Sequence, residues 1–205
     1  MPTAAQILQT LALIANQNTW LSIAWHAAIA LALVAVLAGW KPSLRVTGMI
    51  MALPLLSVSL LAWRYGNPFN GMLFLTAALL LGGLALRLDK RSISIAAGWT
   101  VWAGIAMLAF GWVYPHFLEN AGWLTYLYAS PVGLIPCPTL SATIGLVLLV
   151  DGLSSRSWSL ILAGFGLFYG LFGTFRLHVW LDIGLVVGSL ALAIRALALT
   201  KAGLK

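Results

Sequence analysis

Long apolar runs separated by short polar segments dominate the chain. Each run approaches the roughly 20 residues that a helix needs to cross a bilayer. Aromatic residues such as Trp20, Trp40 and Trp63 stand at their ends, as expected of interfacial anchors. The pattern predicts six spanning helices: Trp20–Trp40, Val46–Trp63, Phe69–Leu88, Ile93–Tyr114, Trp158–Phe175 and Val179–Leu197.

A seventh, shorter span runs from Cys137 to Val150. It follows the motif Pro136-Cys137-Pro138-Thr139, which interrupts an otherwise apolar stretch. Proline lacks a backbone donor and clashes with the preceding helical turn, so we expect a helix to begin at Pro138. Thr139 to Ser141 can help to satisfy free backbone donors near this start. The preceding segment, Tyr126 to Ile135, is predicted to descend as irregular or re-entrant backbone.

The first 16 residues place Ile7, Leu8, Leu11 and Ile14 on one helical face. This spacing predicts a short helix that lies in the membrane interface. The fold class is therefore an all-α integral membrane bundle of about seven spans, the fifth short and broken by proline. Residues 1–205 form a single transmembrane domain in this interpretation.

Composition agrees with a membrane protein. Hydrophobic residues make up 62% of the chain and charged residues 7%, and the mean hydropathy is +1.01. Soluble domains carry roughly 25% charged residues. The net charge of +7 lies in short loops between apolar runs, which does not indicate a nucleic-acid groove. One cysteine excludes an internal disulfide and four-cysteine metal sites.

The basic residues predict the orientation of the spans. Arg64 and Arg176 fall on one side of the seven-span arrangement. The other side holds nine bases: Lys41, Arg45, Arg87, Lys90, Arg91, Arg156, Arg195, Lys201 and Lys205. The positive-inside rule makes the nine-base side cytoplasmic, with the N-terminus outside and the C-terminus inside. We therefore expect a multi-pass protein of the bacterial inner membrane.

Most chemistry-bearing side chains then fall in the outer half. These are His26, His116, His178, Glu119, Asp182, Arg64, Arg176 and Cys137. The span after Cys137 covers only about 21 Å, so the thiol should lie well below the outer surface. The N-terminus of a helix favours thiolate chemistry or metal ligation at such a cysteine.

Two sequence pairs can place a carboxylate beside an imidazole. His116 and Glu119 are three residues apart, and His178 and Asp182 are four apart. Together with Cys137 they are sufficient for one copper or zinc site. In the alternative interpretation, His116 and Glu119 are solvated and Asp182 pairs with an arginine, Arg176 or Arg64.

Haem and transport remain open alternatives. His26 and His178 can lie at comparable depth and serve as axial ligands, although nothing else in the sequence requires haem. A broken helix is a device of transporters, but no charged residue lies in mid-span and no internal repeat is visible. This argues against a secondary carrier and leaves a small-solute permease open. Gly166 and Gly170 form a small-xxx-small pair for helix packing, either internal or between subunits.

The motif also carries a resemblance. Pro131-Val-Gly-Leu-Ile-Pro-Cys-Pro-Thr-Leu, Gly145-Leu-Val-Leu-Leu, a glycine-rich span, Arg176-Leu and Asp182-Ile-Gly-Leu resemble a bacterial family of multi-pass membrane proteins of unknown function. Tyr114 and Pro115 stand where such proteins often have a Tyr-Pro pair. Leu140 departs from the second threonine expected there. The resemblance implies a multi-pass membrane protein and singles out Cys137 and Asp182. It implies no particular reaction.

The leading hypothesis is a non-enzymatic protein that binds a small ligand or metal in an outer pocket. Cys137, Tyr114, Arg64, Arg176, Glu119 and Asp182 are the candidate ligand-binding residues. The candidate metal ligands are Cys137, His116, His178 and His26. One alternative is an assembly subunit of a larger membrane complex, or a homo-oligomer, in the lipid bilayer. The other is a redox protein that uses copper, zinc or haem, none of which the sequence requires.

Overall fold

The computed structural model describes residues 3–119 and 122–202. The α-helices within these ranges are α1 (Ala4–Gln17), α2 (Thr19–Leu37), α3 (Leu44–Arg64), α4 (Pro68–Ala85), α5 (Trp99–Val113), α6 (Tyr126–Ala129), α7 (Pro136–Leu149), α8 (Arg156–Leu171) and α9 (Ile183–Ala202). Short helical turns complete them: η1 (Trp123–Thr125), η2 (Asp151–Ser154), the π-helical η3 (Phe172–Arg176) and η4 (Trp180–Asp182). The all-α class predicted from the sequence is confirmed.

Five helical segments are long and apolar enough to cross a membrane. They are α2, α3, α4, α8 with its π-helical extension, and α9 with the turn before it. The two shorter apolar helices are α5, with 15 residues, and α7, with 14. Pro54 lies inside the continuous helix α3. The seven apolar helices thus correspond to the seven predicted segments, although two fall short of a full span.

The predicted start of the fourth segment is wrong by six residues. The sequence predicts a helix from Ile93, but α5 begins at Trp99. The amides of Ile93 and Ala96 instead donate to the carbonyls of Pro42 and Leu149. Gly98 then takes a φ of +67°, a left-handed conformation that L side chains rarely adopt and that ends the extended segment.

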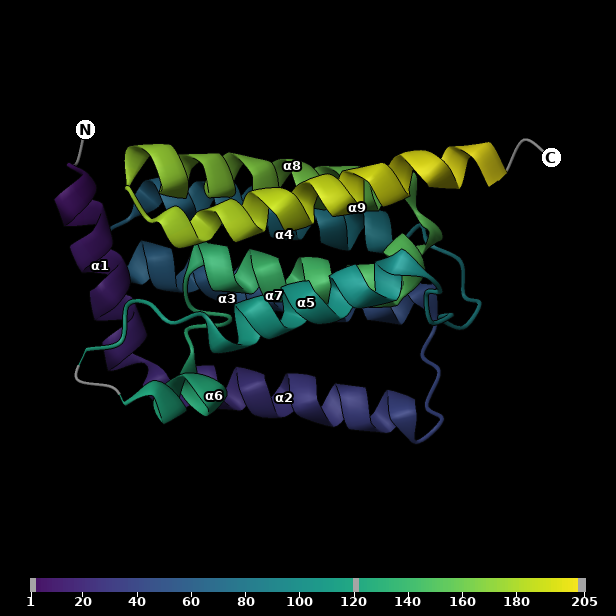
Figure 1. Cartoon of the computed structure of the whole chain (residues 1–205), viewed down its shortest axis with the longest axis horizontal. Coiled ribbons are helices and arrows are strands. Elements are labelled where there is room, and N and C mark those ends of the chain that lie inside the picture. Colours follow the sequence, from purple (N-terminus) through teal and green to yellow (C-terminus); the bar gives the residue numbers. More distant parts are fainter. Residues whose placement is uncertain (1–2, 120–121, 203–205) are drawn as a thin grey trace.

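The long helices alternate in direction, so their connections gather at two ends (Figure 1). One end carries α1, α6 and the starts of α7 and α9. The other carries the connections α2–α3, α4–α5 and α7–α8 and the C-terminal part of α9. Eight of the nine predicted cytoplasmic bases lie at this base-rich end: Lys41, Arg45, Arg87, Lys90, Arg91, Arg156 and Arg195, whose side chains the structure describes, and Lys201 in the last turn of α9. Lys205 lies outside the described residues.

Helix α1 runs across the end of the bundle rather than along it (Figure 1). Thr3 caps it, because its hydroxyl accepts a hydrogen bond from the amide of Gln6, whose side chain bonds back to Thr3. Its buried residues, Leu11, Ile14 and Ala15, face the bundle. The helix predicted for the first residues is therefore confirmed, and its place in a membrane interface stays a prediction.

Helix α7 is the central element of the core. It packs against α3, α5, α8 and α9, and most of its side chains are buried. Its contact with α5 is close enough for the backbones to touch. A Cβ added at Gly145 would lie 2.7 Å from Leu108 Cα, and one at Gly111 would lie 2.7 Å from Pro138 O. Glycine at both positions therefore permits the packing of α5 on α7.

The small-xxx-small pair of α8 also packs inside the chain. A Cβ at Gly166 would collide with the hydroxyl of Ser189 on α9. A Cβ at Gly170 would lie 2.7 Å from Val186 Cγ2 on the same helix. The α8–α9 contact thus uses both glycines, which leaves neither of them on an outer surface for a second subunit.

Candidate functional site

The Pro-Cys-Pro motif starts α7, but two residues earlier than predicted. Ile135 is the extended residue before the helix, and Pro136, Cys137 and Pro138 occupy its first turn. The amides of a first turn have no intrahelical partner, so neither proline removes a hydrogen bond there. Cys137 consequently lies inside the first turn of α7 and not ahead of it.

A buried turn between α6 and α7 sets the position of the motif. Gly133 adopts a φ of +76° and lies against the Trp25 ring, where any larger side chain would collide. The Thr139 hydroxyl accepts a hydrogen bond from the Gly133 amide at 2.8 Å and donates to the Ile135 carbonyl at 2.7 Å. Thr139 therefore stabilises the turn and not the free amides of its own helix.

Two side chains from distant parts of the sequence, Tyr114 and Cys137, meet the carboxylate of Asp182. The Tyr114 hydroxyl, at the end of α5, donates to Asp182 Oδ1 at 2.5 Å. The Cys137 thiol donates to Asp182 Oδ2 at 3.2 Å. Asp182 is 1% exposed and Tyr114 is fully buried, whereas Cys137 is half-buried. We name Tyr114, Cys137 and Asp182 the Asp182 cluster.

The π-helical turn η3 makes room for this carboxylate. A Cβ at Gly173 would collide with Asp182 Oδ2, so only glycine leaves space there. The Gly173 carbonyl accepts a hydrogen bond from the Val179 amide, which closes the chain back toward Asp182. Isolated π-helical turns are frequent at functional sites. The next residue, Thr174, has a fully buried hydroxyl with no hydrogen-bond partner among the described residues.

A second buried pair lies near the thiol. The Tyr169 hydroxyl, on α8, donates to Asn70 Oδ1 on α4 at 3.1 Å. Tyr169 belongs to the hydrophobic core against which Cys137 packs. The sequence analysis did not select Asn70, Tyr169, Gly173 or Thr174. A polar residue within an apolar span was the signal that could have identified Asn70 and Thr174.

The two outer arginines do not neutralise Asp182. Arg64 and Arg176 are both exposed, and neither forms an ion pair within the described part of the chain. The Arg64 guanidinium lies 6.0 Å from the centre of the Tyr65 ring. The alternative interpretation that paired Asp182 with an arginine is therefore wrong. Its partners are two uncharged donors instead, so neither arginine contributes to the cluster.

The two predicted histidine–carboxylate pairs do not form. His178 is exposed while Asp182 is buried, with no hydrogen bond between them. His116 packs edge-on against the Phe117 ring at 4.2 Å. Glu119 is exposed, and its backbone amide donates to Asn16 Oδ1 at 3.0 Å. Partial burial lowers the pKa of His116 below its usual value, because the charged ring loses hydration.

His26 has a structural role between α2 and α5. Its Nδ1 lies 2.9 Å from the Ser22 carbonyl and its Nε2 lies 3.0 Å from the Trp112 carbonyl. Both ring nitrogens face backbone oxygens, so neither points to a position for a haem iron. No group of three or more His, Cys, Asp or Glu side chains in the described ranges could hold a metal ion. The structure gives the predicted copper, zinc or haem centre no support.

Comparisons with protein-family models, with curated proteins and with solved structures found no match to this chain. The site must therefore be interpreted from its own geometry. It offers one buried carboxylate, one half-buried thiol and one phenol.

Proposed function

We propose that this chain is a multi-pass membrane protein that binds a small polar ligand at the Asp182 cluster. The observation that carries the proposal is the buried carboxylate of Asp182, which receives two neutral donors and no positive charge among the described residues. Burying an ionised carboxylate is unfavourable unless charge or hydrogen bonds compensate for the lost hydration. A ligand with positive charge or several hydrogen-bond donors would supply that compensation.

In this proposal the ligand enters past Cys137. Cys137 is half-buried although both of its neighbours, Pro136 and Pro138, are buried. A molecule that reaches the sulfur would next meet the Asp182 carboxylate, 3.2 Å away. In this proposal Asp182 holds the ligand, Tyr114 orients the carboxylate, and Cys137 forms the entrance side of the site. Thr174, the residue after Gly173, has a buried hydroxyl with no hydrogen-bond partner among the described residues.

The assembly alternative has less support. It relied on the Gly166 and Gly170 face as a contact surface, and that face is covered by α9. The membrane resemblance built on the Pro-Cys-Pro-Thr motif stays a prediction, as does the seven-span topology. The five long apolar helices and the alternating ends support a multi-pass membrane protein, and they do not bear on the family resemblance.

Ligand binding can be tested with the purified protein in mild detergent. Native mass spectrometry of the wild type should show a bound small molecule, identified from the mass difference, and elemental analysis should show no stoichiometric metal. Asp182→Asn should lose at least about tenfold in ligand occupancy, the equivalent of one charge-assisted hydrogen bond. Tyr65→Phe is the matched control, because it removes a phenol that bonds Asn18 and Gln17 near the same end.

A protein that is empty in every preparation, and whose Cys137 reacts with N-ethylmaleimide equally in wild type and Asp182→Asn, would contradict the proposal. Cys137 is the only cysteine, so the labelled position is unambiguous. Equal loss of occupancy in Tyr65→Phe would point to a general loss of folding instead of a loss of the site.

The proposed topology makes its own prediction. If the base-rich end is cytoplasmic, a reporter protein that is active only in the cytoplasm should be active when it is fused after Lys205. The physical reason is the excess of lysine and arginine at that end, which resists translocation across the membrane. Phosphatase activity outside the membrane from the same fusion would reverse the orientation and move Cys137 to the cytoplasmic side.

A further inference from the structure

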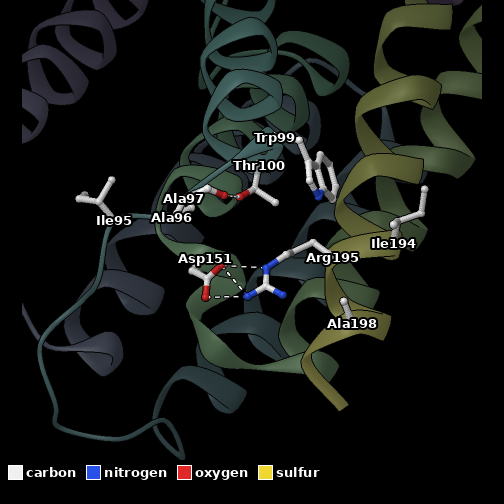
Figure 2. A pocket seen from close by; sticks show the side chains of 9 residues that line it. All are labelled: Ile95, Ala96, Ala97, Trp99, Thr100, Asp151, Ile194, Arg195 and Ala198. Carbon is white, nitrogen blue, oxygen red and sulfur yellow. Dashed lines mark hydrogen bonds and ion pairs between the residues drawn. The ribbon is translucent and has the colours of Figure 1, made fainter. Parts of the chain in front are cut away.

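A cavity of about 460 Å³ lies at the opposite end of the bundle from Cys137. Figure 2 shows its lining: the extended segment before α5, the first residues of α5, the turn after α7 and one face of α9. The polar side chains among them are Thr100, Asp151 and Arg195. Its place among the bases of the base-rich end makes it a candidate for an anionic ligand.

Arg195 is fixed in the cavity by a two-point ion pair. Its Nε donates to Asp151 Oδ1 at 2.8 Å, and its Nη2 donates to Asp151 Oδ2 at 2.7 Å (Figure 2). The two side chains remain 21% and 25% exposed, so the pair is reachable from the cavity. A guanidinium has five N–H donors, and this fork uses two of them. The remaining donors can bind a second anionic group without breaking the pair.

Further hydrogen-bond donors lie at the start of α5, whose first residues line the cavity. Figure 2 shows the indole nitrogen of Trp99 on the side of its ring that faces Arg195. Helix α5 begins at Trp99, and no side chain caps its free amides. Helix N-termini and guanidinium groups both favour phosphate oxygens. Thr100 instead uses its hydroxyl hydrogen on the Ala97 carbonyl, at 2.8 Å.

The rest of the opening is apolar. Trp99, Ile95 and Ile194 are 51%, 58% and 60% exposed, respectively. They line the cavity together with the ion pair, and exposed tryptophans commonly anchor helices in the headgroup region of a membrane. A ligand that matches both the guanidinium of Arg195 and this apolar opening carries a phosphate next to a hydrocarbon chain. The charge of this end favours an anionic headgroup, since the bases with described side chains number seven and the acids, Asp89 and Asp151, only two.

We propose that this cavity binds the phosphate of an anionic phospholipid, with its acyl chain along Trp99 and Ile194. Arg195 is the principal phosphate contact, the Trp99 indole adds a hydrogen bond, and Asp151 holds the guanidinium in place. The proposal uses no residue of the Asp182 cluster. It rests on the membrane location proposed above, which the reporter fusion tests separately.

The test compares lipid binding in detergent by native mass spectrometry. Purified protein is titrated with phosphatidylglycerol or with phosphatidylcholine of the same chain length. Wild type should retain phosphatidylglycerol with about tenfold higher affinity, which corresponds to about 1.4 kcal/mol. Arg195→Gln should remove this preference. Trp99→Phe, which keeps an aromatic ring and the ion pair, should reduce it by a smaller factor. Arg87→Gln is the matched control, because it removes an exposed base at the same end outside the cavity.

Glycerol phosphate, added as a competitor, separates a lipid from a free phosphate. If glycerol phosphate displaces phosphatidylglycerol only at large excess, the result supports a lipid site. If glycerol phosphate binds as tightly as phosphatidylglycerol, the site belongs to a soluble phosphate and the proposal is overturned. Equal retention of the two lipids by wild type would also overturn it. Equal losses of the preference for phosphatidylglycerol in Arg87→Gln and Arg195→Gln would overturn it as well. If Arg195→Gln does not fold, an unchanged preference in Trp99→Phe overturns the proposal in its place.

Discussion

Replacing Gly145 by alanine should force α5 away from α7 and lower the free energy of unfolding by about 3 kcal/mol, the upper part of the usual range for overpacking. The added methyl would lie 2.7 Å from Leu108 Cα and 2.8 Å from Gly104 O. These are backbone atoms, so no rotamer change can relieve the contact. The two helices must separate or bend, and α7 carries Cys137 into the candidate site.

Thermal unfolding in detergent measures this effect. Gly164→Ala is the matched control, since it adds the same methyl to a helix where no atom lies within 4 Å. The control should be neutral or slightly stabilising, because alanine has a higher helix propensity than glycine. Equal midpoints for the two variants would mean that α5 and α7 do not pack at backbone contact.

The second large effect concerns the hydrogen bond from Tyr114 to Asp182. Tyr114→Phe should destabilise the protein by about 2 kcal/mol, within the range for hydrogen bonds to charged groups. The bond joins the end of α5 to the start of the last helix, across 68 positions of the sequence. Its loss leaves the buried carboxylate with Cys137 as its remaining side-chain donor.

A double-mutant cycle isolates this bond from other consequences of the substitution. Tyr114→Phe should cost clearly less in the Asp182→Asn background than in wild type, because the amide oxygen that replaces the carboxylate accepts a weaker hydrogen bond. Tyr65→Phe should cost the same in both backgrounds. If Tyr114→Phe also costs the same in both, the two side chains do not interact and the Asp182 cluster is not a unit.

Both experiments test contacts on which the proposed ligand site depends. Gly145 positions the helix of Cys137, and Tyr114 holds the carboxylate that would receive the ligand. A variant that keeps its stability but loses ligand occupancy separates recognition from folding. Asp182→Asn is suited to this purpose, because the side chain keeps its shape and can still accept from Tyr114.

Much of the helical pattern follows from the sequence alone. Runs of about 20 apolar residues leave the backbone no alternative to helix in an apolar environment, since every amide must find a partner within the segment. The predicted and observed bounds agree within a few residues for α3 and α4, for example. The predicted start of the fourth segment was wrong because hydropathy does not report backbone geometry. Ile93 is as apolar as a helical residue, but its amide bonds a neighbouring loop.

The chemistry of the site was harder to predict. The sequence selected Cys137 and Asp182 as reactive or charged groups beside apolar runs, and it selected Tyr114 through the resemblance of its Tyr-Pro pair. It also paired Asp182 with His178 and Glu119 with His116, however, because residues three or four apart were assumed to share a helical face. His178 has a φ of +59° and precedes the turn into α9, so it does not share a face with Asp182.

The sequence by itself therefore determined the all-α class, the apolar segments and the unequal charge of the two ends, because these depend on local composition and periodicity. Only the tertiary structure decided which helices touch and which polar groups meet. Tyr114, Cys137 and Asp182 come from three separate elements, and their contacts depend on the packing of α5, α7 and α9. Glycine positions such as Gly145 and Gly173 permit that packing, and their importance is visible only once the neighbouring atoms are known.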